Sequence, residues 1–180
     1  QVDELVARHA PRSLLDYGSG KGRQYIYKVR GEARCQHQSW DIMPHCYDPG
    51  VLAFSKKPSK QFDGVICTDV AEHIPESEVP WFLADVISYS TKFVFFVIFV
   101  EPAKKSLPDG RNAHLTVKPP TWWGHQLEAA LHAVRLCNFS HTVGSYKPHD
   151  DGVLHIRGSL KGAGREIVSL FRIPPERQKP

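Results

Sequence analysis

Glycines and a carboxylate early in the chain have the types and spacing of a cofactor-binding turn. Residues 14–22 read Leu-Leu-Asp-Tyr-Gly-Ser-Gly-Lys-Gly. Glycines at alternate positions allow the backbone to turn sharply and to approach a ligand closely, and a helix that follows offers free N–H groups. An ordinary glycine-rich turn is the alternative, but acids at matching places farther along the chain favour a nucleotide-like cofactor.

The acid before the glycines indicates which cofactor this is. The dinucleotide fingerprint runs Gly-x-Gly-x-x-Gly, whereas this chain has Gly18, Gly20 and Gly22 at alternate positions. Asp16 stands two residues before the first glycine, where a carboxylate repels a pyrophosphate and attracts a cation. The segment therefore resembles the first motif of the class I S-adenosylmethionine-dependent methyltransferases, in particular the small type 11/12-like members. The resemblance implies that Asp16, Tyr17 and the three glycines bind S-adenosylmethionine.

Two later acids extend the resemblance, which spans roughly residues 13–123. Asp48 begins an Asp-Pro-Gly turn, and the resemblance implies that its two acceptor oxygens bind the ribose diol; a plain turn residue is the alternative. Asp69 begins Asp-Val-Ala-Glu-His-Ile-Pro, which is similar to the segment after strand four of that family. By this likeness Asp69, Val70 and His73 line the cofactor.

Alternating strand and helix patterns position these residues. Strands are predicted at 13–16, 43–47, 62–68 and 92–100 and near 139–145 and 167–172, and helices at 2–9, 23–30, 76–90 and 121–134. This order indicates an α/β fold with a doubly wound, mostly parallel Rossmann-like sheet of about six strands. The most apolar strand, 92–100, is predicted to be central. Ligands of such sheets bind at the carboxyl ends of the strands, where Asp16, Asp48 and Asp69 lie.

The segment after the second predicted strand is too short for the usual layout of the family. Only residues 49–61 are available there, whereas a crossover alone needs about a dozen residues. We therefore predict a sheet that is shortened between strands 2 and 4 of the family. The adenine contacts of the family normally lie on the missing segment, so Phe54 becomes the candidate adenine neighbour, with a core position as its alternative.

The long loop over residues 102–123 is the candidate substrate region. His114 is its candidate general base, because an imidazole accepts a proton from a hydroxyl or amine near neutral pH. A loop histidine bonded to the backbone is the alternative. Arg111, Lys118 and Trp122 are candidate substrate contacts, and the two cations favour an anionic acceptor. Solvated cations and a core tryptophan are the alternatives.

A metal site is a second interpretation of the same region. Asp69 is followed by Glu72 and His73. This run, with His114 downstream, is similar to that of the small-RNA 3′-end 2′-O-methyltransferases, which implies Mg²⁺ bound to a terminal ribose. The same run is common in metal-independent methyltransferases, and imidazole is a poor ligand for Mg²⁺. The metal stays an alternative, and Asp69 joins His114 as a catalytic candidate.

Composition excludes several classes of protein. A chain of 180 residues with 41% hydrophobic and 23% charged residues suits one globular domain, expected over residues 1–173 with a flexible tail at 174–180. A net charge of +4 does not favour a nucleic-acid partner. The longest apolar run, 93–100, is too short to span a membrane. Four scattered cysteines without a Cys-x-x-Cys pair fit a reduced, cytoplasmic protein.

These observations favour a methyltransferase that moves a methyl group from S-adenosylmethionine to an oxygen or nitrogen of a small molecule and releases S-adenosylhomocysteine. A nicotinamide-dependent oxidoreductase is disfavoured by Asp16 and by the glycine spacing. A methyltransferase fold that binds its cofactor without catalysis is the third interpretation. The sequence does not indicate the acceptor or the oligomeric state.

Overall fold

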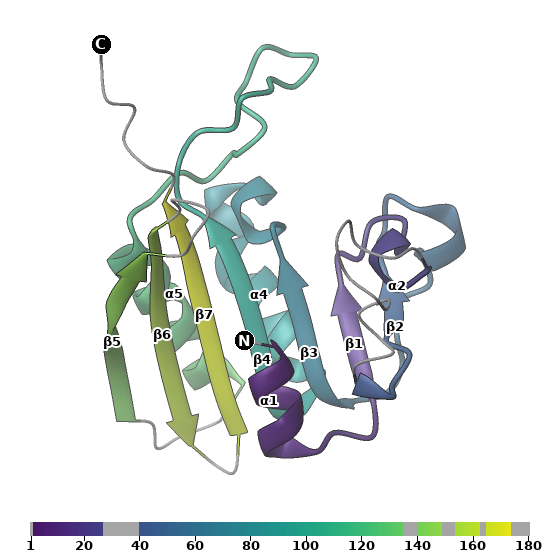
Figure 1. Cartoon of the computed structure of the whole chain (residues 1–180). Helices are drawn as coiled ribbons and strands as arrows, with labels where there is room; N and C mark the ends of the chain where they lie inside the picture. Colours follow the sequence, from purple (N-terminus) through teal and green to yellow (C-terminus); the bar gives the residue numbers. More distant parts are fainter. Residues whose placement is uncertain (1, 27–39, 135–139, 149–153, 163–164, 174–180) are drawn as a thin grey trace.

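A single mixed sheet with helices on both faces organises the protein (Figure 1). The computed structural model describes residues 2–26, 40–134, 140–148, 154–162 and 165–173. The sheet has seven strands in the order β2-β1-β3-β4-β7-β6-β5. Neighbours from β2 to β7 are parallel, whereas β6 runs antiparallel to β7 and to β5. This is the predicted α/β, mostly parallel Rossmann-like class.

The elements have the following bounds. The strands are β1 (Leu14–Tyr17), β2 (His45–Tyr47), β3 (Phe62–Thr68), β4 (Ser90–Phe99), β5 (Ser140–Pro148), β6 (Leu154–Gly162) and β7 (Arg165–Ile173). The α-helices are α1 (Val2–His9), α2 (Arg23–Ile26), α4 (Val79–Ser88) and α5 (Pro120–Ala133). Short 3-10 helices are η1 (Leu52–Phe54), η2 (Ala71–His73) and η3 (Glu76–Glu78).

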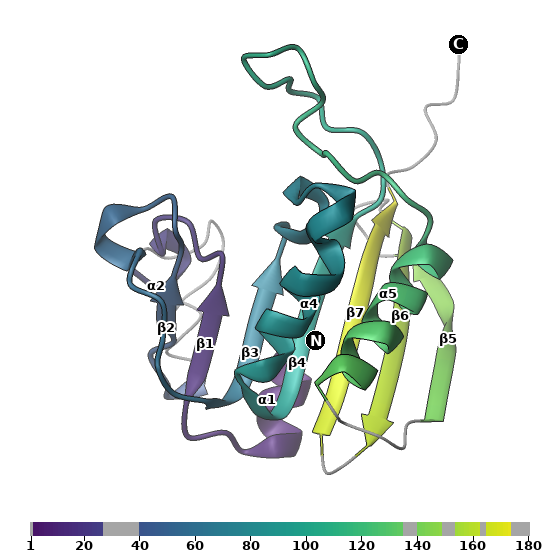
Figure 2. The same ribbon diagram turned by 180° about the vertical axis from the view of Figure 1, so that it is seen from behind.

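The central strand β4 is covered on both faces, as its apolar sequence predicts. Val94 and Phe96 enter the cluster shared with α4 and α5, which lie side by side on one face (Figure 2). Phe93 and Phe95 enter the second cluster, on the face covered by α1. Burial of each of these side chains contributes about 1.5–3 kcal/mol. The apolar side chains of α4 that face the sheet cluster are all buried: Val79, Phe82, Leu83, Val86 and Ile87.

The carboxyl-terminal part of the sheet differs from the prediction. The stretch between the last two predicted strands was expected to be a loop, but it contains β6, so the sheet has seven strands rather than about six. Glycines and charges in Leu-His-Ile-Arg-Gly-Ser-Leu-Lys-Gly conceal an alternation of apolar and polar residues. Such alternation is typical of antiparallel strands, and β6 pairs antiparallel with both of its neighbours.

The shortened segment after β2 is confirmed. Residues 49–61 contain only η1, and β2 is an edge strand whose described neighbour is β1. The helix predicted at 23–30 is described over Arg23–Ile26, and its remainder lies outside the described residues. The predicted tail at 174–180 also lies outside them. Within the described ranges, no helix has the length and apolar character that a membrane crossing requires.

Two cysteines lie in the described part of the chain, and both are free thiols. Cys67 is buried in β3, and Cys46 is half-buried in β2. Burial raises the pKa of both thiols above the ordinary value. Both therefore stay protonated and unreactive near neutral pH. Cys35 and Cys137 lie outside the described residues.

Candidate functional site

The glycine turn follows β1 at the carboxyl edge of the sheet. Gly18, Gly20 and Gly22 all have left-handed backbone angles, with φ of +83°, +56° and +62°. Glycine adopts this region without the steric cost that other residues pay. Gly18 N–H donates to the carbonyl of Tyr47 at 2.7 Å, so the turn is tied to β2. A Cβ atom at Gly18 would overlap the side chain of Val70, whereas one at Gly20 would meet no atom within 4 Å.

The acid of the predicted cofactor motif is buried beneath this turn. Asp16 is 3% exposed. Its Oδ2 accepts hydrogen bonds from the hydroxyl of Tyr25 at 2.8 Å and from Nε2 of Gln24 at 2.9 Å. Burial raises the pKa of Asp16 to about 6, although these two hydrogen bonds lower it in part. A cation beside the carboxylate would favour its charged form. Asp16 therefore also has a structural role, because its hydrogen bonds connect β1 to α2.

Asp48 supports the glycine turn from the neighbouring strand end. Its Oδ2 accepts the N–H of Gly20 and its Oδ1 accepts the N–H of Gly50, both at 2.8 Å. Asp48 thus makes the contacts of a turn residue, which was the alternative to the ribose role. Each carboxylate oxygen has a further lone pair, so the predicted ribose contact stays compatible with this geometry.

Tyr17 was predicted to bind the cofactor, but its side chain points into the core. The ring is 6% exposed and packs edge-on against Tyr47 and Phe82. Its hydroxyl donates to Oδ2 of Asp85 on α4 at 2.7 Å. Burial, with the Asp85 hydrogen bond, raises the pKa of Tyr17 above its ordinary value. The alternation of β1 explains this, since Tyr17 and Asp16 point to opposite faces of the sheet.

The end of β3 brings the third acid to the same edge. Asp69 is exposed and has a left-handed φ of +55°. Its N–H donates to the carbonyl of Val97 at 2.9 Å, which ties the turn to β4. Val70 follows and contacts the turn at Gly18. The structure therefore brings the predicted cofactor residues of β1, β2 and β3 to neighbouring strand ends, with the exception of the Tyr17 side chain.

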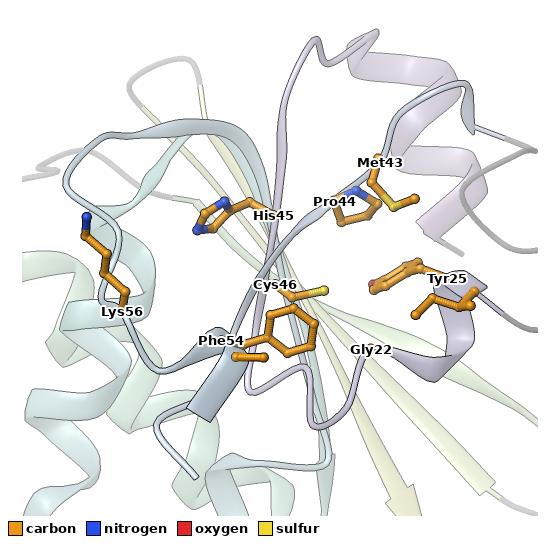
Figure 3. A pocket seen from close by; sticks show the side chains of 10 residues that line it. Gly22, Tyr25, Met43, Pro44, His45, Cys46, Phe54 and Lys56 are labelled. Carbon is orange, nitrogen blue, oxygen red and sulfur yellow. The ribbon is translucent and has the colours of Figure 1, made fainter. Parts of the chain in front are cut away.

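Phe54, the candidate adenine neighbour, lines a pocket beside β2 (Figure 3). The pocket has a volume of about 490 Å³, and Tyr25, Met43 and Cys46 also line it. The Phe54 ring lies against Gly22, where an added Cβ would be 3.3 Å from it. The three acids do not line this pocket. It occupies the outer side of the edge strand, where the sheet is shortened.

A cluster of one acid and two histidines lies beyond the ends of β3 and β4. One ligand atom from each of Glu72, His73 and His114 lies within 4.8 Å of the others. Glu72 is fully buried in η2, and its Oε1 accepts the N–H of Phe99 at 3.2 Å. The two imidazole rings meet edge to face with centroids 5.0 Å apart. Within the described ranges this is the cluster whose donors suit a metal ion.

Main-chain carbonyls fix the tautomer of both histidines. Nδ1 of His73 lies 2.7 Å from the carbonyl of Ala113, and Nδ1 of His114 lies 2.6 Å from the carbonyl of Glu101. A carbonyl only accepts, so each Nδ1 carries a proton and donates. In the neutral ring, Nε2 then keeps its lone pair for a proton or a metal. For His114 the predicted base and its backbone-bonded alternative are therefore both compatible with one geometry.

The predicted substrate cations are engaged within the protein. Lys118 pairs with Glu76 at 2.9 Å and lies over the Trp122 ring. Arg111 pairs with Asp109 at 2.7 Å. Trp122 is half-buried and lies beneath the Lys118 ammonium group. A pocket wall made by Trp122 stays a prediction.

Sequence reasoning missed several contributors to the site. Tyr25 and Gln24, which hold Asp16, lie on the first turn after the glycines, and a helix predicted there could have indicated them. The sequence could not indicate the carbonyls of Glu101 and Ala113 as partners of the histidines, because every residue has a main-chain carbonyl whatever its type. Lys104 and Lys105 are exposed on the same loop and form no side-chain ion pair with any described residue.

Comparisons with known proteins give a remote structural likeness. A scan of protein-family models finds no match, and a search of curated proteins finds no related sequence. Among solved structures, the DhpI–SAH complex is similar to this chain, with 19% sequence identity and a TM-score of 0.44. The match covers 80% of this chain and 77% of that one.

Proposed function

We propose that this protein is an S-adenosylmethionine-dependent methyltransferase of the class I type. The observation that carries the proposal is the alignment of a glycine turn and three acids at the carboxyl ends of adjacent strands. Asp48 lies at the end of β2, Asp16 at the end of β1 and Asp69 at the end of β3, and these three strands are adjacent in the order β2-β1-β3. Ligands of parallel α/β sheets bind at this edge. The small type 11/12-like subclass is part of the proposal, although the segment between β2 and β3 is shorter than the usual layout of the family.

The site residues fit the cofactor chemically. Gly20 faces open space at the turn, so the backbone can approach a ligand. Asp16 is a buried carboxylate whose pKa is raised to about 6, and a cationic ligand offsets the cost of its charge. In the proposal, Asp48 holds the ribose hydroxyls, and Val70 with Asp69 and His73 lines the methionine end. S-adenosylmethionine supplies a methyl group on a sulfonium centre.

His114 is the proposed general base. Its Nδ1 donates to the carbonyl of Glu101, so Nε2 is the atom that accepts the proton of an acceptor hydroxyl or amine. Asp69 is exposed just after the end of β3 and is the second proposed catalytic group. The acceptor is proposed to be a small anionic molecule, with Arg111, Lys118 and Trp122 as its contacts. Lys104 and Lys105 add two exposed cations to that loop.

Calorimetric titration with S-adenosylmethionine and S-adenosylhomocysteine tests the proposal. We expect binding in the micromolar range that Asp48→Asn weakens and that the exposed-site control Glu128→Gln leaves unchanged. Release of S-adenosylhomocysteine in a screen of hydroxyl and amine acceptors supports the enzyme. Binding without turnover for any acceptor favours a binding module. Absence of binding, together with quenching of NADH fluorescence, would replace the proposal by an oxidoreductase.

A metal-assisted reaction is the second candidate, and the cluster of Glu72, His73 and His114 favours it. Both imidazoles donate through Nδ1 to carbonyls, which is the outer contact that orients metal-bound histidines in proteins. Two imidazoles and a carboxylate suit Mn²⁺, Co²⁺ or Zn²⁺ better than Mg²⁺, which prefers oxygen ligands. Bound there, the cation would hold an acceptor diol, such as the terminal ribose of an RNA.

Titration of the protein with Mn²⁺, followed by electron paramagnetic resonance, tests this candidate. We expect loss of the free-ion signal, little competition from Mg²⁺, and loss of binding in Glu72→Gln. Methylation of a short RNA with a free terminal ribose, compared with the same RNA whose terminal 2′-hydroxyl is blocked, tests the acceptor. Full turnover in the presence of EDTA would exclude the metal and leave His114 as a base.

A further inference from the structure

The loop after β4 is an ordered hairpin that projects beyond the sheet (Figure 1, Figure 2). We define it as residues 101–113. Near its tip, the N–H of Leu107 donates to the carbonyl of Arg111 at 2.7 Å. Nearer the sheet, the N–H of Ala113 donates to the carbonyl of Lys105 at 3.0 Å. The two arms are therefore held together along their length.

One side chain joins the two arms at the base of the hairpin. Oδ1 of Asn112 accepts the N–H of Ala103 and the N–H of His114, both at 2.9 Å. Nδ2 of Asn112 donates to the carbonyl of Ala103, also at 2.9 Å. A primary amide makes all three bonds because it carries both acceptor and donor groups. No other uncharged side chain of this size does so.

The same base supplies the carbonyls that orient both histidines. Glu101, at the start of the hairpin, accepts from Nδ1 of His114. Ala113, at its end, accepts from Nδ1 of His73. The returning chain is fastened to η2 through Thr116, whose N–H donates to the carbonyl of Glu72 at 3.0 Å. The distance between the two arms therefore sets where the two imidazoles lie.

We infer that Asn112 is a positioning residue that holds His73 and His114 as Nδ1–H tautomers, with both Nε2 atoms available to the site. The inference rests on the proposed function only for its effect on turnover, because the tautomers are measurable in the protein alone. It applies equally whether Nε2 of His114 accepts a proton or binds a cation. The hydrogen bonds of the Asn112 side chain all go to main-chain groups, so Asn112 acts on the two rings through the main chain.

Histidine ¹⁵N nuclear magnetic resonance at a pH where both rings are neutral tests the inference. In the native protein we expect the Nδ1–H form at both histidines. Asn112→Ala should convert both rings toward the tautomer mixture of free histidine, while Ser106→Ala, an exposed change on the same hairpin, should not. Asn112→Asp keeps the two acceptor contacts and lacks the donor, so we expect an intermediate effect.

Kinetics and binding separate this inference from the proposed function. Asn112→Ala should lower kcat by about 100-fold, the loss that a displacement of about 1 Å of a reacting group produces, and should weaken S-adenosylmethionine binding far less, because His73 is the one proposed cofactor residue that Asn112 positions. Native tautomers in folded Asn112→Ala or, if that variant unfolds, in Asn112→Asp overturn the inference, whatever the activity. Changed tautomers in a protein that binds no S-adenosylmethionine support the inference and reject the proposed function.

Discussion

The glycine turn at residues 18–22 and the base of the hairpin, beside which His73 and His114 lie, are organised in opposite ways. At the turn, side chains organise the backbone, because the carboxylate of Asp48 holds the N–H groups of Gly20 and Gly50. At the hairpin, the backbone organises side chains, because carbonyl oxygens hold the rings of His73 and His114. Replacing Asp48 should therefore lower the stability of the fold at the turn, whereas replacing His114 should lower turnover with little loss of stability.

The largest expected effect is on turnover at the hairpin. His114→Gln removes the proposed base, so we expect kcat to fall by about 100-fold to 10,000-fold, with a thermal midpoint close to that of the native protein. His125→Gln, at an exposed position of α5, is the matched control. Calorimetry should show unchanged cofactor affinity. A large drop in stability would contradict the comparison, because it would mean that the His114 ring holds the hairpin.

The next effect is the pH dependence of the acid beneath the turn. The pKa of Asp16 is raised to about 6 in the folded protein. Its protonated form therefore favours folding, and that contribution is full below the unfolded pKa of about 3.9 and is lost as the pH rises through about 6. The total is about 3 kcal/mol. Urea unfolding from about pH 4 to about pH 8 should show this loss in the native protein and not in Asp16→Asn.

Cofactor binding should have the opposite pH dependence. The ionised carboxylate attracts a cationic ligand, so affinity for S-adenosylmethionine should rise as the pH increases through about 6. Titrations on either side of that pH, in the native protein and in Asp16→Asn, measure this effect. An affinity that does not change with pH would place the cationic group of the ligand away from Asp16.

A smaller effect on stability is expected at Asp48. Asp48→Ala leaves the N–H groups of Gly20 and Gly50 without their acceptor, which costs about 2 kcal/mol. Glu128→Ala, on the exposed side of α5, is the control. Denaturant unfolding measures the free energy of unfolding of both variants. A cost no larger than that of the control would show that the glycine turn keeps its conformation without the carboxylate.

The smallest expected effects distinguish the glycines of the turn. Gly20→Ala adds only the left-handed strain of about 1–2 kcal/mol, because open space surrounds its Cβ position. Gly18→Ala should cost more, because its Cβ would overlap Val70. The double variant Gly18→Ala with Val70→Ala should recover part of the difference in thermal midpoint. Equal costs at both glycines would contradict the close approach of β1 and β3 at this point.

The sequence predicted the fold well where the signal was local. Strand β3 was placed at residues 62–68 and lies there, because a short, mostly apolar run that ends at an acid is typical of a buried strand. The central position of β4 followed from its apolar composition in the same way. Strand β6 was missed because glycines and charges interrupt its alternation, and pairing with β7 and β5 compensates for that weak preference.

The candidate site divides along the same line. The glycine turn and the three acids were named from sequence, because their types and spacing form local patterns. Glu72, His73 and His114 were named through a resemblance to the small-RNA 3′-end 2′-O-methyltransferases, since His114 lies far along the chain from the other two.

The direction of the Tyr17 side chain was not predicted from sequence, since it depends on which face of the sheet lies toward the core. The ion pairs of Arg111 with Asp109 and of Lys118 with Glu76 were not predicted either, because they depend on the path of the loop.

By itself, the sequence determined the class of sheet, the shortening after β2 and the acids at its carboxyl edge, because periodicity and glycine spacing act over a few residues. Only the tertiary structure decided how the histidines are oriented. Their partners are carbonyls of Glu101 and Ala113, and every residue in a chain has a carbonyl. Which one meets an imidazole is set by the path of the hairpin between β4 and α5, and one side chain at its base, Asn112, closes that path.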